Sequence, residues 1–526
     1  MLSDRFHLAT TMAQTESDCT FSFWFECMHG TPEAAKLLSI ENGTQAFEDY
    51  CMKTLVVALS SMALFLSSVG LQADSLRDIY ELALENDAQL KSEEAVYLAK
   101  RETENLSLSA LLPQVGAAYS YQNSSGDEDG FGLGGAGEDE VIVYPDQSSN
   151  RDIDSEGYVI SLEQALFDLT AWFSFQSGKQ VTKEAEATFA ANQQNLIVRV
   201  VEAYLLVLRA QDNLAASQAQ ERAFERQLEQ TQQRFEVGLI AITDVYEARA
   251  ARDLAEVERI VDENDVSVAL ERLSVLTGQQ QSNLNVLVED FKIRPPDPLD
   301  RAAWVDFALQ NNFELRASTH REEAARQTAK ANKMEHAPKV KGGYEYSDFD
   351  IDGDIDVEPV NPVIPPPKSN LKEHMWQVTV SVPLYSGGAI SANRRRAAQE
   401  FNAAREQRIN LSRNTVTSTR SLHMTVLSDV SRIAARKQSI ISSESSVDAT
   451  QAGYEVGTRN VVDVLNAQNS LFRAKRDYAN SRYDYILNLM RLHEKAGLLS
   501  PEDILKLDSF LVPPSSPTAT SVTGTK

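Results

Sequence analysis

The sequence predicts a mixed α and β protein that is built from a tandem repeat. Three observations support this fold class: motifs that recur in both halves of the chain, runs of alternating apolar and polar residues, and two very long helical segments. Apolar periods of about 2 and about 3.6 residues distinguish strands from helices. The strands and the long helices recur in both halves, so the duplication organises the whole fold.

Composition excludes several classes of protein. The chain has 526 residues, a formal net charge of −26, 3 Cys and a mean hydropathy of −0.32. A nucleic-acid partner is not expected, because binding to phosphates requires a basic surface. Three cysteines cannot form a disulfide scaffold. The polar average excludes a bundle of transmembrane helices but permits transmembrane strands, in which polar residues alternate with apolar ones.

An apolar segment near the N-terminus has the parts of a secretory signal peptide. Lys53 precedes the apolar run 55–69, and the small residue Ala73 follows it. Residues 52–73 are therefore predicted to be a signal peptide, and a single membrane anchor is the alternative. A signal peptide belongs at the start of a chain, so residues 1–51 are interpreted as an N-terminal extension from a mis-assigned start.

The rest of the chain divides into two similar halves. Leu84–Leu90 matches Leu309–Leu315 at an offset of 225 positions, and 235–248 matches 454–467 at an offset of 219. The predicted segments are repeat 1 at 74–290, a proline-rich linker at 291–299, repeat 2 at 300–508 and a disordered tail at 509–526.

Each repeat is expected to begin with a helix and a strand hairpin. The leading helices end before Pro113 and Pro338, because proline cannot continue the helical hydrogen bonds; they are predicted at 75–110 and 300–335. Alternating apolar and polar residues predict strands at 114–122, 158–167 and 376–385. Acidic residues concentrate between the paired strands, in segments 126–157 and 342–367 that are expected to be loops.

Each repeat then continues with a long helix and a shorter one. The long helices are predicted at 169–237 and 387–456, and the shorter ones at 244–277 and 463–496. At a rise of about 1.5 Å per residue, each long helix would extend for roughly 100 Å. A leading helix and a returning helix placed end to end would match that length.

The strands raise the question of a membrane. A half-buried hairpin in a soluble domain gives the same alternation as a transmembrane hairpin. If the strands are transmembrane, four per chain are too few to close a barrel, and an open edge is not stable in lipid. The chain would then have to oligomerise, and three copies would supply twelve strands.

The motifs together resemble those of the TolC family of outer-membrane exit ducts. The residues that carry the resemblance are Leu111–Val115, Gln233–Val245, Val382–Gly388 and Ala452–Leu465. The resemblance implies a mixed α and β membrane protein: a trimeric 12-stranded transmembrane β-barrel, with four strands per chain, continuous with a long periplasmic α-helical barrel. It also implies a location in the cell outer membrane, extending into the periplasm.

The resemblance implies a function in multidrug efflux or type I protein secretion. The implied partners are two further copies of the chain in a homotrimer, a periplasmic adaptor (membrane fusion) protein, an inner-membrane efflux pump or ABC exporter, and outer-membrane lipid. The alternative is a periplasmic coiled-coil structural or adaptor protein without a membrane barrel. No catalytic arrangement, cofactor or metal site is predicted; Asp348–Gly353 begins like a calcium loop, but Pro359 stands where that loop needs a bidentate Glu.

The resemblance further assigns residues at the periplasmic end. The predicted gate links within and between protomers involve Thr243, Asp244, Tyr454 and Arg459. An ion pair between Arg and a carboxylate is directional and charge-assisted, so it can lock helices together and still be released. Solvated surface charge is the alternative interpretation of Asp244 and Arg459.

An acidic ring is predicted at the same entrance. Asp463 matches one of two family aspartates that favour cations there, whereas the second position is Asn466. Glu247 is the repeat partner of Asn466 and is predicted to replace the missing carboxylate in part.

Overall fold

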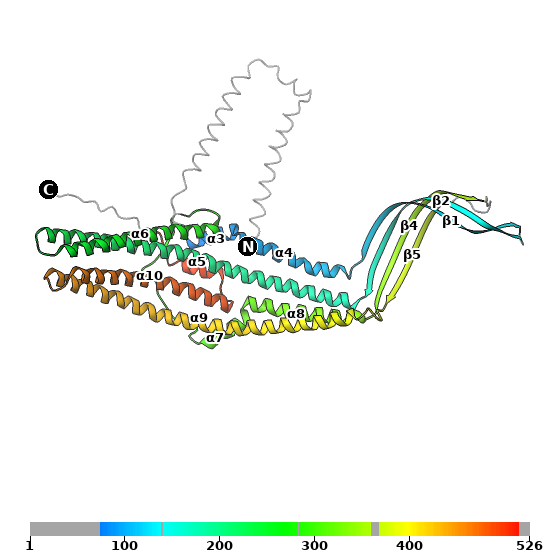
Figure 1. Ribbon diagram of the computed structural model, residues 1–526. Coiled ribbons are helices and arrows are strands. Elements are labelled where there is room, and N and C mark those ends of the chain that lie inside the picture. The colour runs from blue at the N-terminus through cyan, green and yellow to red at the C-terminus, as the bar shows by residue number, and fades with distance from the viewer. Residues whose placement is uncertain (1–73, 138–139, 282, 359–367, 515–526) are drawn as a thin grey trace, which may run out of the picture. The chain divides into compact units, whose positions relative to one another are not determined.

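The two repeats contain the same helices and strands in the same order (Figure 1). The computed structural model describes residues 74–137, 140–281, 283–358 and 368–514, so the predicted extension and signal peptide lie outside it. Repeat 1 contains α3 (Leu76–Asn86), α4 (Ala88–Ser109), β1 (Gln114–Gly137), β2 (Glu140–Phe167), α5 (Leu169–Glu236) and α6 (Ile242–Thr277). Repeat 2 contains α7 (Arg301–Asn311), α8 (Phe313–Lys333), β4 (Lys339–Glu358), β5 (Ser369–Ser381), α9 (Ala389–Glu455) and α10 (Val461–Ala496).

Each leading helix is divided in two, where the sequence predicted a single helix. Asp87 separates α3 from α4, and its side chain accepts a hydrogen bond from the Leu90 N–H at 3.1 Å. Asn312 separates α7 from α8 and accepts from the Leu315 N–H at 2.8 Å. Both residues act as N-caps, which favour an extended backbone and a new helix start over continuation. The apolar period continues across both breaks, so periodicity alone did not reveal them.

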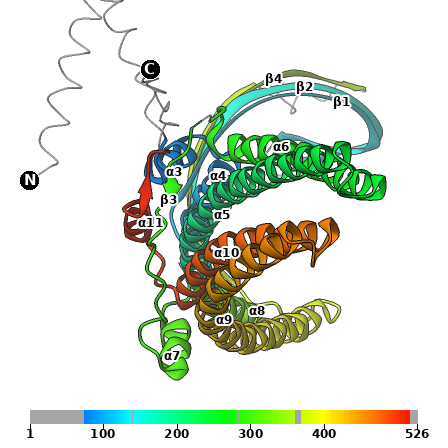
Figure 2. The same cartoon turned by 90° about the vertical axis from the view of Figure 1, so that its left-hand side faces the viewer.

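The short helices lie along the long ones. Helices α5 and α9 have 68 and 67 residues. Both α4 and α6 pack against α5, and both α8 and α10 pack against α9. Two short helices therefore accompany one long helix in each repeat, as their lengths predicted. Helix α5 also contacts α8 and α10, which joins the two repeats side by side (Figure 2).

The four long strands form one antiparallel sheet in the order β1-β2-β4-β5. The β2–β4 pair joins the repeats, with Ile160 opposite Tyr346. Strands β1 and β5 are the edges of the sheet within the chain.

The strands are much longer than expected, with 24, 28, 20 and 13 residues. The acidic segments lie largely within these strands and not in loops, which corrects the sequence-based expectation; residues 359–367 lie outside the described residues. Carboxylates at alternate positions share one face of a strand. Asp154 on β2 lies directly opposite Asp352 on β4, a placement of like charges that is unfavourable by itself. Cross-strand hydrogen bonds also engage them, such as Tyr121 Oη to Asp154 at 2.8 Å and Asn370 Nδ2 to Asp350 at 2.6 Å.

A small second sheet corrects the prediction of a disordered tail. Strand β6 (Leu511–Val512) pairs with β3 (Val286–Leu287), after the short helix α11 (Pro501–Asp508). Leu511 is buried in the main apolar core. The average composition of the tail obscured this apolar residue at its start. The prediction is therefore wrong for 509–514, and 515–526 lie outside the described part of the chain.

The core lies where the two repeats meet, and it includes residues of both. Trp304 and Tyr204 are its largest fully buried side chains. The Trp304 Nε1–H donates to the carbonyl of Pro298 at 2.7 Å, which ties the linker 291–299 to α7. None of the helices that the structure describes has both the length and the apolar character needed to cross a bilayer.

Asp503 links α11 to the end of α10 and gives the fold a dependence on pH. Burial disfavours its charged form. The His493 ring 3.9 Å away and hydrogen bonds from the Ser500 N–H at 3.0 Å and from Lys506 Nζ at 3.1 Å outweigh burial, so the pKa of Asp503 lies below its ordinary value. A depressed pKa in the folded state stabilises the fold above the unfolded pKa. This stabilisation is lost as pH falls through the folded value.

Asp503→Asn is therefore expected to lower the unfolding temperature at pH 7. Near pH 3 the difference in unfolding temperature between variant and wild type is expected to be smaller. Thermal unfolding of the detergent-solubilised protein at both pH values measures this. Glu502→Gln removes a neighbouring exposed carboxylate and is the control. An identical pH dependence in wild type and Asp503→Asn would contradict the assignment.

Candidate gate at the helical hairpin turns

Two helical hairpin turns carry the residues predicted to form a gate. One turn joins α5 to α6 through Gly238, with φ 78°, and the other joins α9 to α10 through Gly457, with φ 79°. Residues with a Cβ rarely adopt this left-handed backbone, so both positions favour glycine. Each repeat thus has a glycine in the turn between its long helix and its shorter one.

Arg459 and Asp463 come together in the second turn. Asp463 lies in the first turn of α10, where its N–H donates to Asn460 Oδ1 at 2.8 Å and its Oδ2 accepts from the Asn460 N–H at 3.5 Å. This reciprocal capping box fixes the start of the helix. Arg459 Nη1 lies 3.8 Å from the same Oδ2. One predicted gate residue is thus paired with one predicted ring residue, in a largely exposed ion pair that contributes little stability by itself.

Asp244 occupies the equivalent position of α6 but has a different environment. The N-cap of α6 is Ala241, which has no side chain for capping. Within the described residues of one chain, no ion pair or side-chain hydrogen bond joins Asp244 or Thr243 to Tyr454 or Arg459. Glu247 is exposed one turn further along α6. The expected gate links are therefore not made inside a single copy, because the intramolecular partner of Arg459 is Asp463.

Tyr454 is buried and not exposed at the turn. Its side chain is 3% exposed and lies in a small apolar cluster that joins the two hairpins. The members of this cluster are Phe224, Ala248, Ala255, Tyr454, Val461, Val464 and Leu465. The Tyr454 hydroxyl is buried and has no hydrogen-bond partner among the described residues.

Arg234 also joins the two hairpins near the turns, although the sequence did not predict a role for it. Its guanidinium lies over the Tyr454 ring, 4.6 Å from the ring centre. It also donates to the carbonyls of Tyr454 at 3.2 Å and Glu455 at 3.3 Å, and so holds the end of α9 against α5. A comparison of the two repeats could have indicated Arg234, because its counterpart in repeat 2 is Gly453 although the surrounding motifs are similar.

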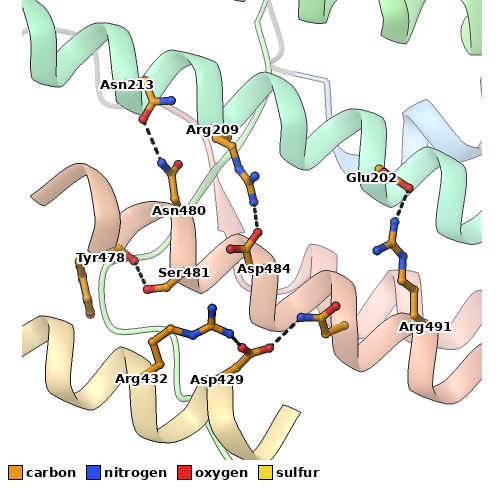
Figure 3. Close-up of polar contacts among 11 residues, drawn as sticks. Glu202, Arg209, Asn213, Asp429, Arg432, Tyr478, Asn480, Ser481, Asp484 and Arg491 are labelled. Atoms are coloured by element: carbon orange, nitrogen blue, oxygen red, sulfur yellow. Dashed lines mark hydrogen bonds and ion pairs between the residues drawn. The ribbon is translucent and has the colours of Figure 1, made fainter. Parts of the chain in front are cut away.

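A series of polar contacts continues from the turns toward the core, between α5 and α10 (Figure 3). Asn480 Nδ2 lies 3.4 Å from Asn213 Oδ1, Arg209 pairs with Asp484, and Arg491 pairs with Glu202 at 3.0 Å. These partners are half-buried or exposed. Such contacts set the register of two helices more than they stabilise them, because water competes for each group.

A buried carboxylate extends this series to α9. Asp429 is 1% exposed and pairs with Arg432, and it accepts a hydrogen bond from Asn488 Nδ2 at 2.8 Å (Figure 3). Nearby, burial raises the pKa of Asp212, and the Tyr483 hydroxyl donates to that residue at 2.7 Å.

This geometry defines a class of protein: paired long helical hairpins on a four-stranded sheet, duplicated within one chain. Comparisons with known proteins identify the class. The family model described as outer membrane efflux protein matches residues 79–279 and 304–498. The chain is 33% identical over 462 residues to outer membrane protein TolC of Vibrio cholerae, which covers 88% of this chain and 99% of that protein.

Two further similarities agree. The alkaline protease secretion protein AprF of Pseudomonas aeruginosa is 29% identical, over 86% of this chain and 90% of that protein. The crystal structure of the outer membrane protein VceC from Vibrio cholerae has a TM-score of 0.65 at 16% identity, covers 80% of this chain and 96% of that one, and supports the fold.

The chain belongs to the outer membrane efflux protein family. It is an outer-membrane exit duct of the type used in efflux and type I secretion, it is located in the outer membrane, and it extends into the periplasm. The alternative of a periplasmic coiled-coil protein without a membrane barrel is not favoured, since the relatives are an outer membrane protein and a protease secretion protein.

Proposed function

We propose that the chain works as a passive homotrimeric duct, without a reaction or cofactor of its own, whose periplasmic entrance is closed by contacts between copies at the two hairpin turns. The observation that carries this proposal is the state of the gate residues in one copy. Asp244 has no ion-pair partner among the described residues, and the side chain of Arg459 is mostly exposed. Charged side chains in this position can form ion pairs with side chains of another copy.

The sheet supports the same assembly. Strands β1 and β5 are edges within the chain, and an unpaired edge is not stable in lipid. Pairing β5 of one copy with β1 of the next removes every edge. Three copies close twelve strands into a transmembrane β-barrel, and their long helices continue it as a periplasmic α-helical barrel.

The acidic ring belongs to the same proposal. Asp463 and Glu247 begin the returning helices at the two turns, so three copies place six carboxylates around one entrance. Carboxylates on a three-fold axis attract cations and disfavour anions. The partners that open this entrance are a periplasmic adaptor and an inner-membrane pump or ABC exporter. The pump or exporter supplies the energy for transport.

Deletion of the chromosomal gene tests the proposed function, with drug susceptibility and secreted proteins assayed in the same strain. We expect increased drug susceptibility, loss of a secreted protein, or both, and restoration by the wild-type chain. Heat-modifiable trimers in the outer-membrane fraction are expected in parallel. A monomer in that fraction, or a deletion strain that exports normally, would contradict the proposal.

A further inference from the structure

A pocket of about 350 Å³ lies between the start of α7 and the middle of α9, far along α9 from the hairpin turns. Figures 1 and 2 show α7 beside α9, and the two helices are in contact. The pocket is lined by Asp300, Arg301, Ala302, Arg420, His423, Met424 and Leu427. The gate and the duct do not account for these residues.

His423 is the first indication of a ligand. It is 2% exposed, and both of its ring nitrogens are buried without a hydrogen-bond partner among the described residues. Buried polar atoms are nearly always hydrogen-bonded, and leaving one unpaired is unfavourable. An imidazole with two unpaired nitrogens in the lining of a pocket is therefore missing a partner.

The charges of the pocket indicate what that partner is. Neither Arg301 nor Arg420 forms an ion pair with any residue that the structure describes, and Arg301 Nη1 contacts the Met424 sulfur at 3.5 Å, a weak acceptor. The Asp300 carboxylate, which also lines the pocket, accepts from the Ala302 N–H at 3.0 Å as the N-cap of α7, and its one negative charge stands against the two positive charges of Arg301 and Arg420. Two guanidinium groups and the N-terminal end of a helix, whose dipole is positive there, favour an anion.

Repeat 1 shows how the equivalent place is filled. The repeat counterparts of Arg301, Arg420 and His423 are Leu76, Val201 and Tyr204, and all three are fully buried. The Tyr204 hydroxyl donates to the Asn285 carbonyl at 2.7 Å, and the Leu76 N–H donates to Asp508 Oδ1 at 2.9 Å. The C-terminal segment thus covers repeat 1 and supplies a carboxylate to the start of α3.

Within the described residues, no segment covers repeat 2 in the same way, and the exposed Arg301 and Arg420 occupy the positions of the buried Leu76 and Val201. We propose that the pocket between α7 and α9 is a binding site for a carboxylate or phosphate anion, held by Arg301 and Arg420 with the His423 ring as a further donor. In repeat 2 a bound anion would take the place of the carboxylate that Asp508 provides in repeat 1. It is independent of the gate.

Calorimetric titration of the full-length protein in detergent at low salt tests this site, with succinate and inorganic phosphate as separate probes. We expect saturable binding of at least one anion and at least a tenfold loss of affinity in Arg420→Gln. The control is Arg394→Gln, which removes the same charge from an exposed position of the same helix. His423→Phe keeps a ring of similar size without nitrogens and is expected to weaken binding severalfold while unfolding at the wild-type temperature.

The assembled protein distinguishes a free anion from a carboxylate on a polypeptide. If neither probe binds, but a cryo-EM map without added anion places a carboxylate side chain of a second copy against Arg420, the site is confirmed with the polypeptide as its source. Two results would overturn the proposal: equal binding by wild type and Arg420→Gln, or no binding of either probe together with no carboxylate in the pocket.

Discussion

Arg234→Ala is expected to raise the ion conductance of the closed duct severalfold. The guanidinium joins the two hairpins by two hydrogen bonds to the end of α9 and by its position over the Tyr454 ring. Charge-assisted hydrogen bonds of this kind contribute roughly 1.5–3 kcal/mol each when partly buried. Without them the turn end of the α9–α10 hairpin is held less tightly against α5–α6. Single-channel recording in planar bilayers measures the effect.

Arg226→Ala is the matched control, because Arg226 is exposed on the same helix two turns before Arg234. Arg459→Ser separates contacts within a copy from contacts between copies. Inside one copy it removes only an exposed pair with Asp463, so a large increase in conductance would report a link to another copy. An Arg234→Ala trimer with wild-type conductance would show that the hairpins are held together by other contacts.

Gly497→Ala is expected to destabilise the protein by about 3 kcal/mol, from a left-handed backbone that disfavours Ala and from steric overlap. Gly497 ends α10 with φ 71°. A Cβ there would lie 2.4 Å from the carbonyl oxygen of Asn311, an atom of the backbone where α7 meets α8. The main chain would have to move at the point where the short helices of repeat 2 meet. Thermal or urea unfolding in detergent measures the loss.

The duplication provides the control. Gly278 is the repeat counterpart of Gly497 and has φ 72°, but a Cβ there would meet only the side chain of Asn86, at 3.2 Å. Gly278→Ala therefore shares the backbone penalty without the overlap with main-chain atoms. Equal destabilisation by the two substitutions would contradict the argument from close approach.

The sequence predicted the helices well because each long helix has an apolar stripe and each hairpin turn has its glycine. The breaks at Asp87 and Asn312 were missed, since a capping side chain competes with helix continuation locally and leaves the apolar period unchanged. The strand ends were missed for a related reason. Loop prediction relied on acidic composition, whereas alternate carboxylates on a solvent-facing strand are compatible with pairing.

The sequence predicted where the candidate gate residues lie in the turns, but not which of them pair within one copy. The positions of Arg459 and Asp463 in the second turn follow from the motif, and the structure pairs them. The contribution of Arg234 depends on packing between elements about 220 residues apart, which periodicity does not report. His423 does not stand out in the sequence, because its unpaired nitrogens become evident only when α7 is seen to pack against α9.

The hydrogen bond from the Leu76 N–H to Asp508 has a consequence for biogenesis. It joins the first described helix to a residue 432 positions later, and the adjacent β3–β6 pair depends on the same late segment. Closing so long a loop is entropically unfavourable until the intervening elements have folded. Helix α3 therefore acquires its final contacts only after nearly the whole chain has been synthesised. A chain truncated before α11 would lack the Asp508 acceptor for the Leu76 N–H and the strand that pairs with β3, and so would leave this edge of the core uncovered.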